Sequence, residues 1–285
     1  MRVVSLSRPD ADVEALAAVD AMLAAARPGH RLGFVRDARA LPPTSSARLA
    51  FVHADTRIAH ARVGASHMAI GLGDVVVLRS GDSLELDAPL SFVVLELPEP
   101  FAAEAPSFLC PDRDPRLTDR PGGCATAHDA YRRILLTWLP TNGPYTCRAV
   151  NCHRVCMTDS FSHYHPRDGG FEELYLVHDV RPGAGLHWSP DVGRIEAPAL
   201  VDRATARTLV RSTPLAAGDL VFIPRGTMHR AVGGVLAHVV TIPGFVPARE
   251  IGLDHHLRAI GERLGLVGDE ALPYQLAASS GPVVK

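Results

Sequence analysis

The most informative segment of this 285-residue chain is Gly218-Asp219-Leu220-Val221-Phe222-Ile223-Pro224-Arg225-Gly226-Thr227-Met228-His229. The run from Leu220 to Ile223 is apolar throughout, as in a buried strand. Pro224 and Gly226 then predict a turn, because proline fixes φ and glycine relieves steric limits. The segment therefore predicts a strand, a turn and a second strand that begins near His229.

A second group of polar residues lies upstream of this segment. His163 and His165 are two residues apart, so on a strand both side chains point to the same face. Glu173 begins the run Glu173-Leu174-Tyr175-Leu176-Val177, which predicts a further strand whose odd-numbered residues share one face. With His229 these residues supply three imidazoles and one carboxylate, a set that suits a borderline divalent transition metal.

This pattern resembles the cupin superfamily, whose first motif is His-x-His, a gap and Glu. Its second motif is Gly, five residues, Pro-x-Gly, two residues and His, and Gly218 to His229 matches it at every position. The first motif matches in its ligands but has a longer gap, and Met157 and Gly233 replace the family's usual glycine and asparagine. The gap leaves Glu172 as an alternative to Glu173, which we favour because it stands where the family's glutamate usually stands, four residues before Val177.

The resemblance implies a mainly β fold, the double-stranded β-helix or jelly-roll-like barrel. Apolar runs at 49–52, 75–78 and 92–95 predict short strands in the first half as well. The segment from Gly81 to Leu86 echoes Gly218 to Ile223. We therefore expect a bicupin with a degenerate N-terminal barrel that lacks the ligands, together with a few peripheral helices.

Four regions follow from these patterns. Residues 1–97 are expected to form the degenerate barrel, with a helix at 10–26 that Asp10 or Asp12 caps. Residues 98–143 read as a proline-rich linker followed by a helix that starts at Thr126. Residues 144–245 are expected to be the metal-binding barrel, with strands near 145–157, 171–178, 206–211, 219–223, 227–232 and 236–242, and residues 246–285 a helical tail.

Composition excludes several classes of function. A net charge of −2 and a pI near 6.7 provide no basic surface for nucleic acid or anionic lipid. No apolar run approaches the length of a membrane span, and the first residues lack the core of a signal peptide. The five cysteines include no Cys-x-x-Cys pair, so they are expected to be reduced thiols, although a role of Cys152 or Cys156 stays open. These features predict a cytoplasmic enzyme with a small-molecule substrate, and family habit adds a homodimer.

Two further residues are candidates for catalysis. Tyr175 lies two residues after Glu173, so its phenol should point into the barrel near the metal and serve there as hydrogen-bond donor or general acid. His187 lies in the long stretch from Arg181 to Thr205, which is predicted to be a loop that closes over the site.

The favoured function is an Fe(II) oxygenase or dioxygenase acting on a small polar organic molecule. Mn(II), Ni(II) and Zn(II) are alternative metals, although four protein ligands would saturate tetrahedral zinc. A redox-neutral isomerase, lyase or decarboxylase on the same ligands is the main alternative, and a non-catalytic metal- or ligand-binding barrel is the second.

Overall fold

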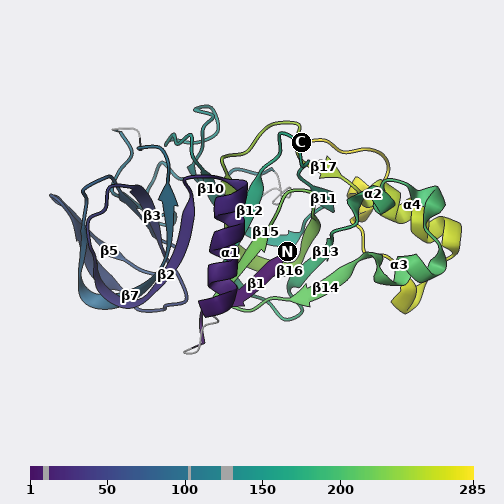
Figure 1. Cartoon of the computed structure of the whole chain (residues 1–285), viewed down its shortest axis with the longest axis horizontal. Helices are drawn as coiled ribbons and strands as arrows, with labels where there is room; N and C mark the ends of the chain where they lie inside the picture. Colours follow the sequence, from purple (N-terminus) through teal and green to yellow (C-terminus); the bar gives the residue numbers. More distant parts are fainter. Residues whose placement is uncertain (9–12, 102–103, 123–130) are drawn as a thin grey trace.

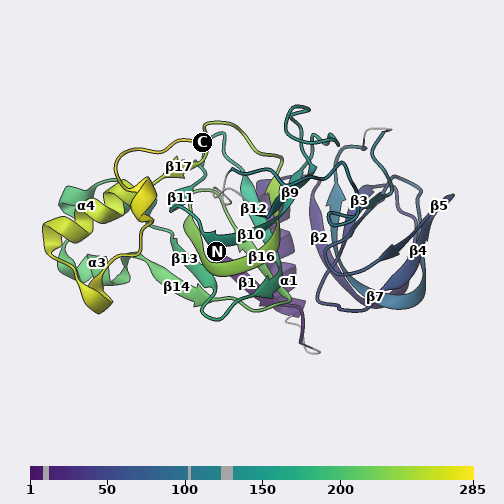
Figure 2. The same cartoon turned by 180° about the vertical axis from the view of Figure 1, so that it is seen from behind.

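The computed structural model describes residues 1–8, 13–101, 104–122 and 131–285. Two strongly curved antiparallel sheets lie side by side, and a group of helices follows at the far end of the second sheet (Figure 1). Figure 2 shows the same order from behind. The architecture is mainly β and of the bicupin type, as the sequence predicts.

The first sheet has seven strands and encloses the first barrel. The long β7 is its centre, since it pairs with three other strands. Strict alternation of buried and exposed residues in β4 shows that one face of the sheet lines the interior. The strands are β2 (Arg31–Leu41), β3 (Ala47–Val52), β4 (Ala59–Val63), β5 (Ser66–Ile70), β6 (Val75–Leu78), β7 (Leu84–Leu97) and β8 (Phe108–Leu109).

The second sheet has ten strands and forms the second barrel around β16, which pairs with four others. Its first strand comes from the start of the chain, because β1 pairs with β15. Residues 1–97 therefore contribute to both sheets. The strands are β1 (Arg2–Ser5), β9 (Arg132–Leu136), β10 (Asn151–Asp159), β11 (His163–Tyr164), β12 (Glu172–Val180), β13 (Gly185–Ser189), β14 (Arg211–Pro214), β15 (Asp219–Ile223), β16 (Met228–Ile242) and β17 (Ile251–Gly252).

The outer faces of the two barrels pack against each other through a shared apolar core. Phe51 on β3 and Phe222 on β15 are buried in this core, and α1 (Val13–Ala26) contributes Val19 and Leu23. Each barrel also has its own interior core. Because side chains of a strand alternate between faces, the same strands serve an interior and the interface.

The remaining helices cover one end of the second barrel. They are α2 (Val192–Ile195), α3 (Arg203–Leu209) and α4 (Asp254–Leu264), with short 3₁₀ turns at Pro198–Leu200, Gly268–Glu270 and Leu276–Ala278. The stripe Leu253, Leu257 and Ile260 is buried against the elements around α2 and α3, which confirms the predicted helix of the tail. No helix in the described part of the chain has the length and apolar character needed to cross a lipid bilayer.

Several sequence-based predictions are confirmed and others are wrong. The first helix is confirmed from Val13, while Asp10 and Asp12 lie outside the described residues. The predicted strand at 206–211 is largely α3, because the Asp202 carboxylate caps a helix by accepting from the Thr205 amide at 2.7 Å. The predicted loop from Arg181 to Thr205 instead contains β13, α2 and the start of α3.

The helix expected after the linker is also wrong within the described residues. Arg132–Leu136 forms β9, which pairs antiparallel with β10, while Thr126 lies outside the described part. The apolar run Ile134-Leu135-Leu136 is compatible with a strand as well as with a helix. Pairing with β10 favours the strand.

The internal repeat exists, but in another register. Gly73-Asp74 lies at the start of β6 as Gly218-Asp219 lies at the start of β15, with φ values of 86° and 87° at the two glycines. Each aspartate accepts a hydrogen bond at 2.8 Å from the amide three residues earlier. Gly81-Asp82 shares both features, but strand pairing separates the two: β3 pairs with β6 and β7 as β12 pairs with β15 and β16. The counterpart of Gly218 is therefore Gly73 rather than Gly81.

Candidate metal centre

Four buried side chains meet at one end of the second barrel. His163 on β11 pairs with His229 at the start of β16, so the two side chains lie on the same face. Glu173 comes from β12, and His165 follows β11. One ligand atom of each of the four residues lies within 4.8 Å of the others, and all four residues are at most 3% exposed.

The turn of the second motif holds the first motif in place. The Gly226 amide donates to the His165 carbonyl at 2.7 Å, and Gly226 has a φ of 77° that disfavours other residues. The two motifs are thus joined through the backbone, beside the four side chains.

Backbone carbonyls orient two of the imidazoles. Nδ1 of His163 lies 3.0 Å from the Phe161 carbonyl oxygen, and Nδ1 of His229 lies 3.1 Å from that of Thr227. A carbonyl only accepts, so each Nδ1 carries the hydrogen and each Nε2 keeps its lone pair.

The atoms that face the centre have no other hydrogen-bond partner within the described structure. This holds for Nε2 of all three histidines and for Oε2 of Glu173, which lies 2.9 Å from Nε2 of His229. Burial lowers the pKa of His163 and His165 well below 6.5, with the neighbouring His229 adding to the effect. Neutral imidazoles and a carboxylate with inward lone pairs are the donor set of a divalent transition metal, so the residues fit such an ion.

Glu172 and Glu173 have different surroundings. Glu172 accepts from Arg225 Nε at 2.6 Å and also forms an ion pair with Arg27. These two guanidinium groups satisfy its carboxylate outside the cluster, whereas Glu173 points into it. The geometry therefore places Glu173, not Glu172, with the three histidines.

A small polar cavity of about 100 Å³ adjoins Glu173. Its lining includes Glu250, whose pKa burial raises to about 7, with the charge of Glu173 adding to the rise. Lys285 lies beside it, because residues 250 and 285 exchange backbone hydrogen bonds of 3.0 Å. Further polar lining residues are Arg132, Asn142, Asn151, His153 and Thr241.

No motif in the sequence indicates these lining residues. Thr241 pairs with both Glu173 and Asn151, so strand register alone brings them to the cavity. Glu250 belongs to the tail, which the sequence marked only as packing. Glu250 lies beyond the whole of β16 from His229, the last residue of the second motif, and no pattern in the sequence points to it.

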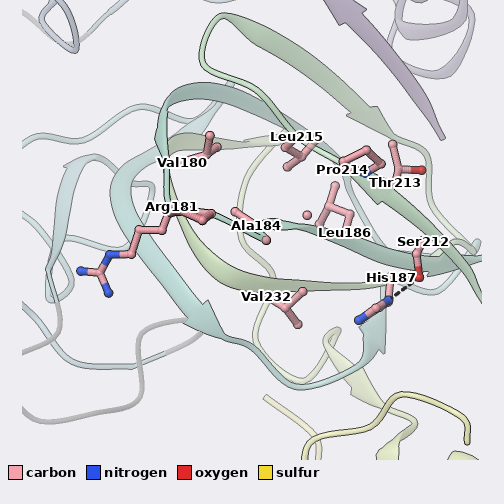
Figure 3. A pocket seen from close by; sticks show the side chains of 13 residues that line it. Val180, Arg181, Ala184, Leu186, His187, Ser212, Thr213, Pro214, Leu215 and Val232 are labelled. Atoms are coloured by element: carbon pink, nitrogen blue, oxygen red, sulfur yellow. Dashed lines mark hydrogen bonds between the residues drawn. The ribbon is translucent and has the colours of Figure 1, made fainter. Parts of the chain in front are cut away.

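The structure separates the two candidate catalytic residues. Tyr175 is fully buried inside the second barrel, with its ring centroid 6.3 Å from that of His229. His187 lies on β13, and its Nδ1 is 2.8 Å from the Ser212 hydroxyl. It lines a different, mostly apolar cavity of about 610 Å³ (Figure 3), which none of the four clustered residues lines.

Fold and cluster together define a protein with two antiparallel β-barrels, the second of which holds a buried His-His-Glu-His group. No family profile matches the chain, and no curated protein sequence matches it. Solved structures with a similar fold include an IolB-like protein from Salmonella typhimurium (16% identity, TM-score 0.48, 76% of this chain and 83% of that one). Others are the oxalate decarboxylase of Lactobacillus farciminis (13%, 0.45, 87% and 85%) and procruciferin, an 11S globulin of Brassica napus (10%, 0.48, 82% and 83%).

Proposed function

We propose that the chain is a mononuclear metal-dependent enzyme acting on a small polar organic molecule, with an Fe(II) oxygenase as the favoured reaction class. The observation that carries the proposal is the convergence of four buried ligand atoms without other partners, with backbone carbonyls fixing the tautomer of His163 and His229. Leaving these atoms unpaired would cost free energy, and a divalent cation removes that cost.

The metal would be held by His163, His165, Glu173 and His229. Four protein ligands leave one or two positions on an octahedral ion for a substrate or for dioxygen. Fe(II) uses such positions for oxygen chemistry, whereas Mn(II), Ni(II) and Zn(II) act there as Lewis acids.

The adjoining cavity limits the substrate. A volume of about 100 Å³ admits only a small molecule or one end of a larger one. Arg132 and Lys285 offer positive charge to a carboxylate or an enolate, and Glu250 offers a carboxyl group that can accept a proton. Tyr175 is fully buried beside His229, where its phenol would serve as a hydrogen-bond donor or general acid.

A redox-neutral isomerase, lyase or decarboxylase is the second candidate. The carboxyl group of Glu250 in the cavity favours it, because such reactions need a proton acceptor next to the substrate. The same ligand set serves both candidates, so the test must separate oxygen use from metal use.

The test measures metal content and oxygen uptake together. Protein purified without chelator or nickel resin is analysed for metals, and oxygen consumption is followed with a panel of small carboxylic acids and polyols. Near-stoichiometric iron and substrate-dependent oxygen uptake support the oxygenase. Turnover without oxygen, with manganese or nickel bound, supports the redox-neutral candidate.

Two variants control this test. His229→Ala should lose the metal, whereas His60→Ala, at an exposed position of β4, should keep it. Wild-type protein that binds no metal from an equimolar mixture of these ions would refute the enzyme and leave a binding barrel.

A further inference from the structure

The first barrel has its own cavity at the position that corresponds to the candidate metal centre. Strand pairing gives the correspondence. Arg48 pairs with Leu78 on β6 and Glu96 on β7, just as Glu173 pairs with Ile223 on β15 and Thr241 on β16. Arg48 is therefore the counterpart of Glu173.

The other ligand positions are apolar in the first barrel. Leu41 pairs with Leu84 as His163 pairs with His229, so two leucines stand where two histidines stand. A buried arginine and two leucines cannot hold a metal ion. In the first barrel, the cation-binding residues are therefore absent from these positions, and the buried cation Arg48 stands at the position of Glu173.

The first cavity has a volume of about 450 Å³, several times that of the cavity beside Glu173. Four pairs of corresponding positions line the two cavities: Arg31 and Asn151, Gly33 and His153, Arg48 and Glu173, and Glu96 and Thr241. Glycine in place of His153 removes a ring from the wall, which helps to explain the larger volume.

Arg48 is only 5% exposed and lines this cavity. One of its terminal nitrogens, Nη2, donates to the carbonyls of Pro42 at 2.7 Å and Asp82 at 3.3 Å, while Nε has no partner. Within the described residues no carboxylate forms an ion pair with it. A guanidinium stays charged, so Arg48 is a buried cation that lacks a contacting anion.

Two other charged residues, Arg31 and Glu96, line the same cavity. Arg31 is already paired with Asp20 through Nε and Nη2. Glu96 lies in the same cross-strand row and lines the same cavity, and no ion pair or side-chain hydrogen bond of Glu96 occurs in the described part of the chain. The cavity thus presents one unfilled donor group, on Arg48, and one unfilled acceptor, on Glu96.

We propose that the first barrel is a second binding site, which takes a small organic carboxylate that also carries a hydrogen-bond donor, such as a hydroxy acid or an amino acid. Arg48 binds the carboxylate through charge-assisted hydrogen bonds. Glu96 accepts from the hydroxyl or ammonium group. Apolar walls from Leu41, Val35 and Val94 contact the carbon skeleton. The site needs no metal and is independent of the function proposed for the second barrel.

Isothermal titration calorimetry with four matched probes tests this proposal. L-lactate and L-alanine carry both groups, propionate lacks the donor, and ethanolamine lacks the carboxylate. We expect lactate or alanine to bind, propionate to bind about tenfold more weakly, and ethanolamine not to bind. Absence of heat from all four probes at about 10 mM would overturn the proposal.

Variants assign any binding to the first barrel. Arg48→Met should abolish it, and Glu96→Gln should reduce the preference for lactate over propionate. Arg62→Met, which changes an exposed arginine of β4 paired with Glu85, should bind as the wild type does. His229→Ala should also retain binding, which separates this site from the metal centre. Unchanged affinity in Arg48→Met, or loss in His229→Ala, would refute the assignment.

Stability provides a check that needs no ligand. Because Arg48→Met removes a buried charge without a contacting anion, its midpoint of urea unfolding should match or exceed that of the wild type. A lower midpoint would show that Arg48 serves the fold itself, and would count against the site.

Discussion

Acid should loosen the interface between the two barrels, and His53 should account for a measurable share of the effect. His53, His178 and His238 are all buried there, with His178 Nε2 3.1 Å from His238 Nδ1 and the rings of His53 and His178 5.6 Å apart. Burial lowers the pKa of His53 from 6.5 to about 4. The pKa values of His178 and His238 also fall well below 6.5, mainly through burial.

The sign of the effect follows from proton uptake. The unfolded chain binds a proton at His53 near pH 6.5, whereas the folded chain does so only near pH 4. The contribution of His53 is therefore complete above pH 6.5 and is lost as the pH falls towards 4. Linkage with these two values predicts a loss of about 2 kcal/mol between about pH 7.5 and pH 5 from this residue alone.

The perturbation is His53→Leu, which keeps an apolar side chain in the interface and removes the titrating group. Urea unfolding, followed by the fluorescence of Trp138 and Trp188, gives the free energy of unfolding at both pH values. The variant should lose about 2 kcal/mol less than the wild type on acidification. His67→Leu, at an exposed position of β5, serves as the control and should behave as the wild type. An equal loss in His53→Leu and wild-type protein would refute this reasoning.

Three further predictions concern the metal centre and the end of the second barrel. His229→Ala, or the double change at His163 and His165, should abolish metal binding in elemental analysis while the circular dichroism spectrum stays that of a folded β protein; unchanged metal content would end the assignment. Glu172→Gln should keep the metal but lower the free energy of unfolding by about 2 kcal/mol, because Arg27 and Arg225 lose a buried partner; loss of metal instead would exchange the roles of the two glutamates. Leu257→Ala should cost about 3 kcal/mol in urea unfolding, since this side chain of α4 is fully buried against the elements around α2 and α3, and a cost below 1 kcal/mol would show that this end is loosely packed.

Short-range patterns in the sequence are enough to predict most of the residues of the candidate metal centre. His163 and His165 share a face because their spacing is two, and the turn at Pro224 and Gly226 places His229 at the start of a strand. The preference for Glu173 over Glu172 comes from its position four residues before Val177, and only the ion pairs of Glu172 show where the other carboxylate goes. These features are local, so one chain segment is enough to predict them.

The errors arose where a short segment fits two structures. The run Ile134-Leu135-Leu136 became a strand because β10 offers an edge, and Arg203–Leu209 became a helix because Asp202 caps it and the apolar core around α4 accepts Ala206 and Leu209. The hydrophobic pattern alone does not distinguish a helix from a strand in these segments, because the contacts that stabilise one or the other come from residues distant in the sequence.

The barrel type, the presence of two related halves and the identity of the four clustered side chains can all be predicted from sequence patterns. The register of the repeat, the polar lining supplied by Glu250 and Lys285, and the presence of Arg48 at the position of Glu173 in the first barrel become visible only in the folded chain. The difference arises because a strand fixes which of its residues face inward, whereas pairing with other strands fixes which inward residues meet.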